Sequence, residues 1–143
     1  MTNIDVVRRV YEAWNGPDPI EDVIPLLDPA FEWVNPSYAV DGGTRHGHDG
    51  WRHANRNIAA VFEAYHHEVG ELHEDDDKVV SLTTFVAQSR AGGVKYEKSE
   101  PQVWTLRDGK VVRLEWFHDQ DEALRAVGVS DLADLRGPGP SAG

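Results

Sequence analysis

The stretch that decides the fold is QVWTLRDGKVVRLEWFHD, residues 102–119. Two apolar runs flank Asp108-Gly109, and Asp-Gly between alternating runs predicts a β-hairpin, because glycine accepts the positive φ of a primed turn. Alternation places one set of side chains on a single face of each predicted strand: Gln102, Trp104 and Leu106 on the first, and Val112, Leu114, Trp116 and His118 on the second. The hairpin is therefore expected to form one wall of a core or pocket.

Further strands are predicted upstream of this hairpin. In FEWVN, residues 31–35, Phe31, Trp33 and Asn35 share a face. Pro101 cannot donate to a ladder, so it should interrupt the strand that leads into the hairpin. The predicted strands cover residues 31–35, 67–74, 79–91 and 94–106, and the last of these ends as the first arm of the hairpin.

Apolar residues at helical spacing predict helices before and after these strands. A first helix should start at Thr2 or Asn3, and a short helix over 18–27 should be kinked by Pro25. The main helix is expected to start at His48 or Asp49 and to run through His67. Its stripe is Trp51, Ala54, Asn55, Ile58, Val61, Phe62 and Tyr65. A last short helix should follow Asp119.

Two segments lack such periodicity. Residues 37–50, SYAVDGGTRHGHDG, read as a loop long enough to act as a flap over a site. Residues 130–143 end in the low-complexity run RGPGPSAG and are expected to form a mobile tail after a domain over 1–129. Helices early in the chain and consecutive strands late in it indicate an α+β fold, with helices on one face of a curved antiparallel sheet.

Composition excludes several classes of function. The 143 residues carry a net charge of −11 without a basic stripe, which argues against nucleic acid or an anionic membrane as partner. The chain has no cysteine, so disulfides and thiolate chemistry are excluded. No apolar run is long enough to span a bilayer, and a cytoplasmic protein is the expectation.

Four stretches together resemble the SnoaL-like branch of the NTF2-like, or ketosteroid isomerase-like, superfamily. They are VVRRVYEAWNG, LLDPAFEWVNP, RHGHDGWR and VWTLRDGKVVRLEWFHDQDEALRAVG. The resemblance implies a cone-shaped α+β barrel in which a curved antiparallel sheet wraps around the long helix and leaves a deep pocket. It also implies a homodimer and a cofactor-independent cyclase, isomerase or hydrolase, but the fold does not choose among them.

The residues suggest candidates for such a site. His118 is the expected general acid or base, because imidazole titrates near neutrality, and a pocket-wall or core histidine with a satisfied hydrogen bond is the alternative. Asp119 is a possible assistant, although a helix N-cap is its simpler role. A pocket for a small apolar, cyclic ligand would be lined by aromatic and amide side chains. The candidates are Trp33, Asn35, Trp51, Asn55, Phe62, Gln88, Gln102, Trp104 and Trp116.

Three alternatives remain open at this stage. The histidines His46, His48 and His53 would form a metal site only if they converged with a fourth group, so a solvated loop is favoured and no metal is predicted. An epoxide hydrolase-like enzyme would match Asn35, but the run TTFVAQ lacks the arginine and aspartate that this mechanism uses. A non-catalytic binding or dimerisation module with the same pocket is the third alternative.

Overall fold

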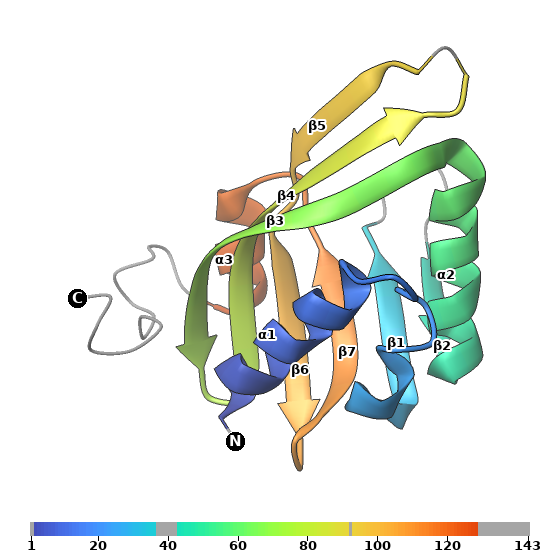
Figure 1. Ribbon diagram of the computed structural model, residues 1–143. Coiled ribbons are helices and arrows are strands. Elements are labelled where there is room, and N and C mark those ends of the chain that lie inside the picture. The colour runs from blue at the N-terminus through green and yellow to red at the C-terminus, as the bar shows by residue number, and fades with distance from the viewer. Residues whose placement is uncertain (1, 37–42, 92, 129–143) are drawn as a thin grey trace.

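A computed structural model describes residues 2–36, 43–91 and 93–128. Within these residues the fold is α+β, with one curved sheet and three α-helices (Figure 1). The strands follow the order β2-β1-β7-β6-β4-β3, and β5 pairs with β4 beside β6. Their bounds are β1 Leu27–Asn35, β2 Gly43–His46, β3 Phe62–Asp75, β4 Lys78–Ser89, β5 Lys95–Ser99, β6 Gln102–Arg107 and β7 Lys110–Trp116.

The predicted hairpin is confirmed. Strands β6 and β7 are antiparallel, and Asp108 and Gly109 both have positive φ, 53° and 76°, as a primed turn requires. The predicted interruption at Pro101 is also confirmed, because β5 and β6 pair with successive parts of β4 and are separated by residues 100–101. The sheet is not antiparallel throughout, since β1 runs parallel to β7.

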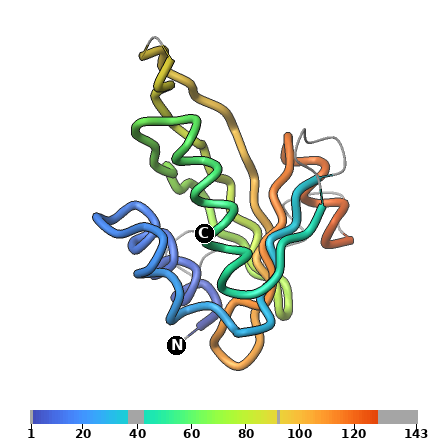
Figure 2. Tube along the Cα trace, turned by 90° about the vertical axis from the view of Figure 1, so that its right-hand side faces the viewer, coloured from blue at the N-terminus to red at the C-terminus, as the bar shows by residue number. Residues whose placement is uncertain are grey.

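The helices cover both faces of the sheet. Helices α1 (Asn3–Trp14) and α2 (Gly47–Val61) lie on the concave side, and α3 (Gln120–Ala126) lies on the other, as the turned view shows (Figure 2). The main core fills the concave side and contains Trp14, Trp51 and Trp104. A smaller cluster of Val80, Val103, Ala123 and Leu124 packs α3 against the outer face. Alternation along β4 and β6 explains the division, because neighbouring residues point to opposite faces.

Local signals explain where two helices begin. Thr2 caps α1 through its hydroxyl, which accepts from the Asp5 amide, and Asp5 accepts from the Thr2 amide in return. Asp119 caps α3 by accepting from the Glu122 amide at 2.9 Å. The capping role is therefore the one that the structure shows for Asp119. None of the described helices is long and apolar enough to cross a membrane.

Several predicted boundaries were wrong. The long helix begins after His46 and ends at Val61, and β3 begins at once with Phe62. Phe62 and Tyr65 fitted a helical stripe, but they pair in β3 with β4 instead, where aromatic residues are equally at home. Residues 18–27 form turns, a 3₁₀-helix η1 (Ile24–Leu26) and the start of β1, because Pro25 prevents a longer helix.

The predicted flap is largely regular structure. Residues 43–46 form β2 and residues 47–50 begin α2, while residues 37–42 lie outside the described residues. Gly50 is required at the start of α2, since a Cβ there would lie 2.7 Å from the Arg45 carbonyl carbon. The predicted mobile tail, residues 130–143, also lies outside the described residues.

Candidate functional site

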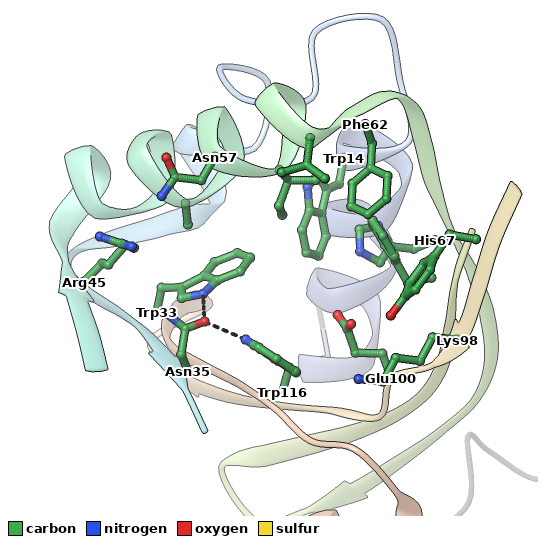
Figure 3. A pocket seen from close by; sticks show the side chains of 15 residues that line it. Trp14, Trp33, Asn35, Arg45, Asn57, Phe62, His67, Lys98, Glu100 and Trp116 are labelled. Carbon is green, nitrogen blue, oxygen red and sulfur yellow. Dashed lines mark hydrogen bonds between the residues drawn. The ribbon is translucent and has the colours of Figure 1, made fainter. Parts of the chain in front are cut away.

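A cavity of about 320 Å³ opens on the concave side of the sheet (Figure 3). Side chains from α1, α2 and six of the strands line it, so its walls come from segments far apart in the sequence. The lining residues are Trp14, Trp33, Asn35, Arg45, Ala54, Asn57, Ile58, Val61, Phe62, His67, Phe85, Tyr96, Lys98, Glu100 and Trp116. The volume lies within the range of small-molecule sites.

Aromatic rings form most of the wall. Trp14 and Trp33 meet edge to face with centroids 6.0 Å apart, and Phe62 meets Phe85 in the same way at 5.4 Å. Tyr96, which is exposed, extends this group with its ring 5.7 Å from Phe62. Such rings bind flat apolar molecules through large contact areas at little entropic cost.

Asn35 connects two of the indoles. The Nε1 atoms of Trp33 and Trp116 both donate to Asn35 Oδ1, at 2.9 and 2.7 Å. An indole N–H is only a donor, so the amide oxygen must face the two rings and the NH₂ group must point elsewhere. The two indoles therefore hold the amide of Asn35, a lining residue, in a fixed orientation.

Glu100 brings a carboxyl group into the cavity. It lies between β5 and β6, and its backbone N–H donates to the Thr83 carbonyl at 2.7 Å. Burial raises the pKa of this carboxyl to about 7, against the opposing effects of Lys98 and of a hydrogen bond from the Gln102 side chain. A carboxyl with this pKa can give or take a proton at neutral pH.

His67 is the second group in the wall whose pKa is shifted. The residue is only 3% exposed, and the centroid of its imidazole ring lies 3.8 Å from that of the Trp14 ring. Burial, and less strongly His66, lowers the pKa of His67 to about 3, so the imidazole is neutral. Its Nδ1 atom is buried and has no hydrogen-bond partner in the described residues. A buried polar atom without a partner is costly to the fold and is a common feature of functional sites.

A buried polar network lies behind Glu100. The Tyr11 hydroxyl donates to Gln102 Oε1 and lies 2.6 Å from the Ser81 hydroxyl. Trp104 Nε1 donates to Tyr11 and Ser81 at 3.1 and 3.2 Å. Because Gln102 Oε1 accepts from Tyr11, its NH₂ group is the part that can donate to Glu100. The network therefore fixes the amide that faces the carboxyl.

Two cations also line the cavity, although the chain is strongly acidic. Lys98 Nζ lies 5.7 Å from the centroid of the Trp116 ring, a cation–π distance. Arg45 Nη1 lies 3.2 Å from His53 Nδ1, and the guanidinium is on the opposite side of the cavity from Lys98 (Figure 3).

The structure brings four of the predicted pocket residues together. Trp33, Asn35, Phe62 and Trp116 line the cavity. Four others are fully buried and bond within the fold instead: Trp51, Asn55, Gln102 and Trp104. Gln88 is exposed, and its amide donates to the Gly93 carbonyl.

The strand on which the prediction for His118 depended does not reach this residue. Strand β7 ends at Trp116 and the chain then turns into α3. His118 is exposed and is not among the lining residues. Its predicted neighbour Asp119 has its carboxylate engaged in the helix cap.

The three histidines near the start of α2 do not converge. His46 faces Glu32, His48 bonds to the Leu27 carbonyl and His53 contacts Arg45. Within residues 2–36, 43–91 and 93–128, no three histidine, aspartate or glutamate side chains are grouped so as to hold a metal ion.

Sequence reasoning missed Glu100 and His67, the two described cavity residues whose pKa is shifted. Glu100 precedes the proline that breaks a strand, and that break was the only available signal. His67 fell at the predicted junction of helix and strand, so its face was not assigned. Trp14 belongs to both the core and the cavity wall.

The fold and this cavity define an NTF2-like α+β protein with a pocket on the concave face of its sheet. Residues 7–114 match the family model described as a SnoaL-like domain. This match spans most of the chain, and the chain belongs to the SnoaL-like domain family. A comparison with curated proteins found no match.

Solved structures agree with this assignment. TerC, co-crystallized with polyporic acid, is 28% identical, with a TM-score of 0.72 over 82% of this chain and 91% of its own. An NTF2-like protein of unknown function from Burkholderia pseudomallei is 27% identical, with a TM-score of 0.73 over 90% and 100%. A ketosteroid isomerase-like protein from Catenulispora acidiphila, in complex with trimethylamine, is 16% identical over 90% and 95%, with a TM-score of 0.71, and shares the fold alone.

Proposed function

We propose that this protein binds a small, cyclic, largely apolar molecule in the cavity and catalyses a cofactor-independent proton transfer on it, as an isomerase or cyclase does. The observation that carries the proposal is the Glu100 carboxyl, which lines the cavity among aromatic rings. Its pKa of about 7 allows it to exchange a proton near neutral pH. Perturbed titratable groups in a cavity are typical of active sites.

Glu100 takes the acid/base role that the sequence suggested for His118. As a carboxylate, it would remove a proton from a carbon next to a substrate carbonyl, and the electron pair of that C–H bond would pass to the carbonyl oxygen as an enolate. The protonated Glu100 would then return the proton, either to another carbon in an isomerisation or to the new alkoxide after ring closure. A shared proton of this kind needs a pKa close to the working pH.

The neighbouring groups suit the enolate. The Asn35 NH₂ group is a donor held in place by two indoles, and Lys98 carries a positive charge at the same cavity. Donors fixed before the reaction stabilise a developing oxyanion without reorganisation. The neutral His67 adds a polar atom in the wall that carries no charge.

The comparisons support a ligand-binding role for this fold. TerC, at 28% identity, was crystallised with polyporic acid, and the distant Catenulispora acidiphila protein was crystallised with trimethylamine. Both are small molecules, and we carry over to this chain only a small-molecule ligand.

Hydrogen–deuterium exchange tests the proposed chemistry. The probe is 2-tetralone, a cyclic aromatic ketone with exchangeable α-hydrogens, and NMR measures the loss of their signals in D₂O. We expect the wild type to accelerate exchange above buffer and Glu100→Gln to lose at least about 100-fold of this acceleration, the scale of general acid–base catalysis. The matched control His118→Gln should retain it.

Other outcomes would change the assignment. Exchange that survives in Glu100→Gln but is lost in His118→Gln would return the role to His118. If calorimetry shows that 2-tetralone binds but the wild type does not accelerate exchange, the protein is a non-catalytic binder.

We also propose that the protein is a homodimer, as the resemblance to this superfamily implies. Light scattering coupled to size-exclusion chromatography measures the mass in solution. A mass near twice 16.0 kDa is expected, and a mass near 16.0 kDa would contradict the proposal.

A further inference from the structure

The charges at the cavity have the opposite sign to those of the whole chain. The net charge of the sequence is −11, from 25 acidic and 14 basic residues. Among the described residues, the charged side chains that line the cavity are Arg45, Lys98 and Glu100, so this part of the wall has two basic groups and one acidic group. His67 adds no charge, because it is neutral.

Lys98 is placed differently from its neighbour on the same strand. Lys95 Nζ lies 3.7 Å from a Glu97 carboxylate oxygen, on an exposed part of β5. Lys98 makes no ion pair within the described residues, and its ammonium lies 5.7 Å from the Trp116 ring in the cavity wall. A half-buried cation on the face of a ring can pair with an anion, and the nearby Glu100 carboxyl competes for Lys98 only when it is ionised.

We infer that the ligand of this site is an organic anion: a cyclic, apolar body that packs against the indoles, with a carboxylate, enolate or phenolate group that pairs with Lys98. Trp33 and Trp116 provide the apolar surface beside that ammonium (Figure 3). Arg45, on the other side of the cavity, adds to the positive potential that draws an anion into an otherwise acidic molecule. The inference rests on the proposed function and specifies the class of ligand.

Calorimetry with three matched probes tests the inference. The probes are 1-naphthoate, the neutral 1-naphthalenemethanol and the cationic 1-naphthylmethylammonium, which share one ring system and differ in charge. We expect naphthoate to bind about tenfold more tightly than the alcohol, since one charge-assisted contact is worth about that factor. The ammonium compound should bind most weakly.

Two variants locate the charge that is responsible. Lys98→Met should weaken naphthoate binding about tenfold and leave binding of the alcohol unchanged. Lys95→Met removes the same charge from the same strand outside the cavity, and it should leave both affinities unchanged.

The outcomes separate this inference from the proposed function. Equal affinity for naphthoate and the alcohol, or equal losses in Lys98→Met and Lys95→Met, would overturn the inference and leave the apolar pocket intact. If none of the three probes binds, the proposed pocket function is contradicted, and the inference falls with it.

Discussion

The imidazole of His67 lies against the indole of Trp14, with ring centroids 3.8 Å apart, where the end of α1 meets β3. The next residue after Trp14 explains this placement. Asn15 Nδ2 donates to the His67 carbonyl at 2.9 Å, and the His67 amide donates to Asn15 Oδ1 at 2.8 Å. Strand β3 is at the edge of the sheet, so its outer side has no neighbouring strand. The Asn15 side chain makes the two hydrogen bonds to His67 that such a strand would otherwise make.

Removal of this amide should therefore destabilise the fold. Asn15→Ala loses both hydrogen bonds, and we expect the free energy of unfolding to fall by about 1–3 kcal/mol, measured by urea denaturation. Gln88→Ala is the matched control, because the Gln88 amide makes one exposed hydrogen bond to a loop, and its loss should cost less than about 0.5 kcal/mol. Equal losses in the two variants would show that Asn15 does not hold α1 to β3.

Glu100 should make the protein less stable as the pH rises. Burial raises its folded-state pKa from 4.5 to about 7, so the stabilising contribution is fully present below pH 4.5 and is lost as the pH rises through 7. Relative to Glu100→Gln, the wild type should lose about 2 kcal/mol of unfolding free energy between pH 5 and pH 8, measured by urea denaturation. If the difference between the two proteins does not change with pH, Glu100 is not buried in this way.

His67 should have the opposite effect. Burial lowers its folded-state pKa from 6.5 to about 3, so its contribution is present above pH 6.5 and is lost as the pH falls toward 3. Relative to His67→Leu, the wild type should lose about 3 kcal/mol of unfolding free energy over this interval. The control His46→Gln removes an exposed histidine and should leave the acid limb of the stability curve unchanged. An acid limb that persists in His67→Leu would contradict the assignment.

Tyr11 should be essential to the buried network. Burial raises the pKa of its hydroxyl to about 12, so it remains a donor at every pH at which the protein is folded. Tyr11→Phe leaves Gln102 Oε1 without its donor, and we expect a loss of about 2 kcal/mol in urea denaturation. Tyr65→Phe is the control, because the Tyr65 hydroxyl makes no hydrogen bond within the described residues. A loss of the same size in Tyr65→Phe would argue against a special role for the network.

Local signals in the sequence were sufficient for much of the fold. The Asp108-Gly109 turn, the break at Pro101 and the cap at Asp119 each depend on the backbone requirements of a few neighbouring residues. The end of α2 did not follow from the sequence, since Phe62 continues the helical spacing and is equally suited to a strand. Pairing of β3 with β4 decides between helix and strand at Phe62, and the residues next to Phe62 in the sequence do not reveal this pairing.

The candidate site was harder to predict for the same reason. Trp33, Asn35 and Trp116 were found because alternation within each strand assigned them to one face. His67 lies on β3, whose register shifts between Val69 and Leu72. Alternation counted back from the C-terminal end of β3 therefore does not give the face on which His67 lies. Glu100 enters the cavity because β5 and β6 share β4 as a partner, which only the three-dimensional pairing reveals.

The most direct test of this account is the titration of the Glu100 carboxyl. Its side-chain carbon can be followed by ¹³C NMR in the folded protein from pH 4 to pH 9 and assigned by its absence in Glu100→Gln. We expect a midpoint near 7. A midpoint near the ordinary value of 4.5 would mean that Glu100 lies in water, and the proposed acid/base role would be contradicted.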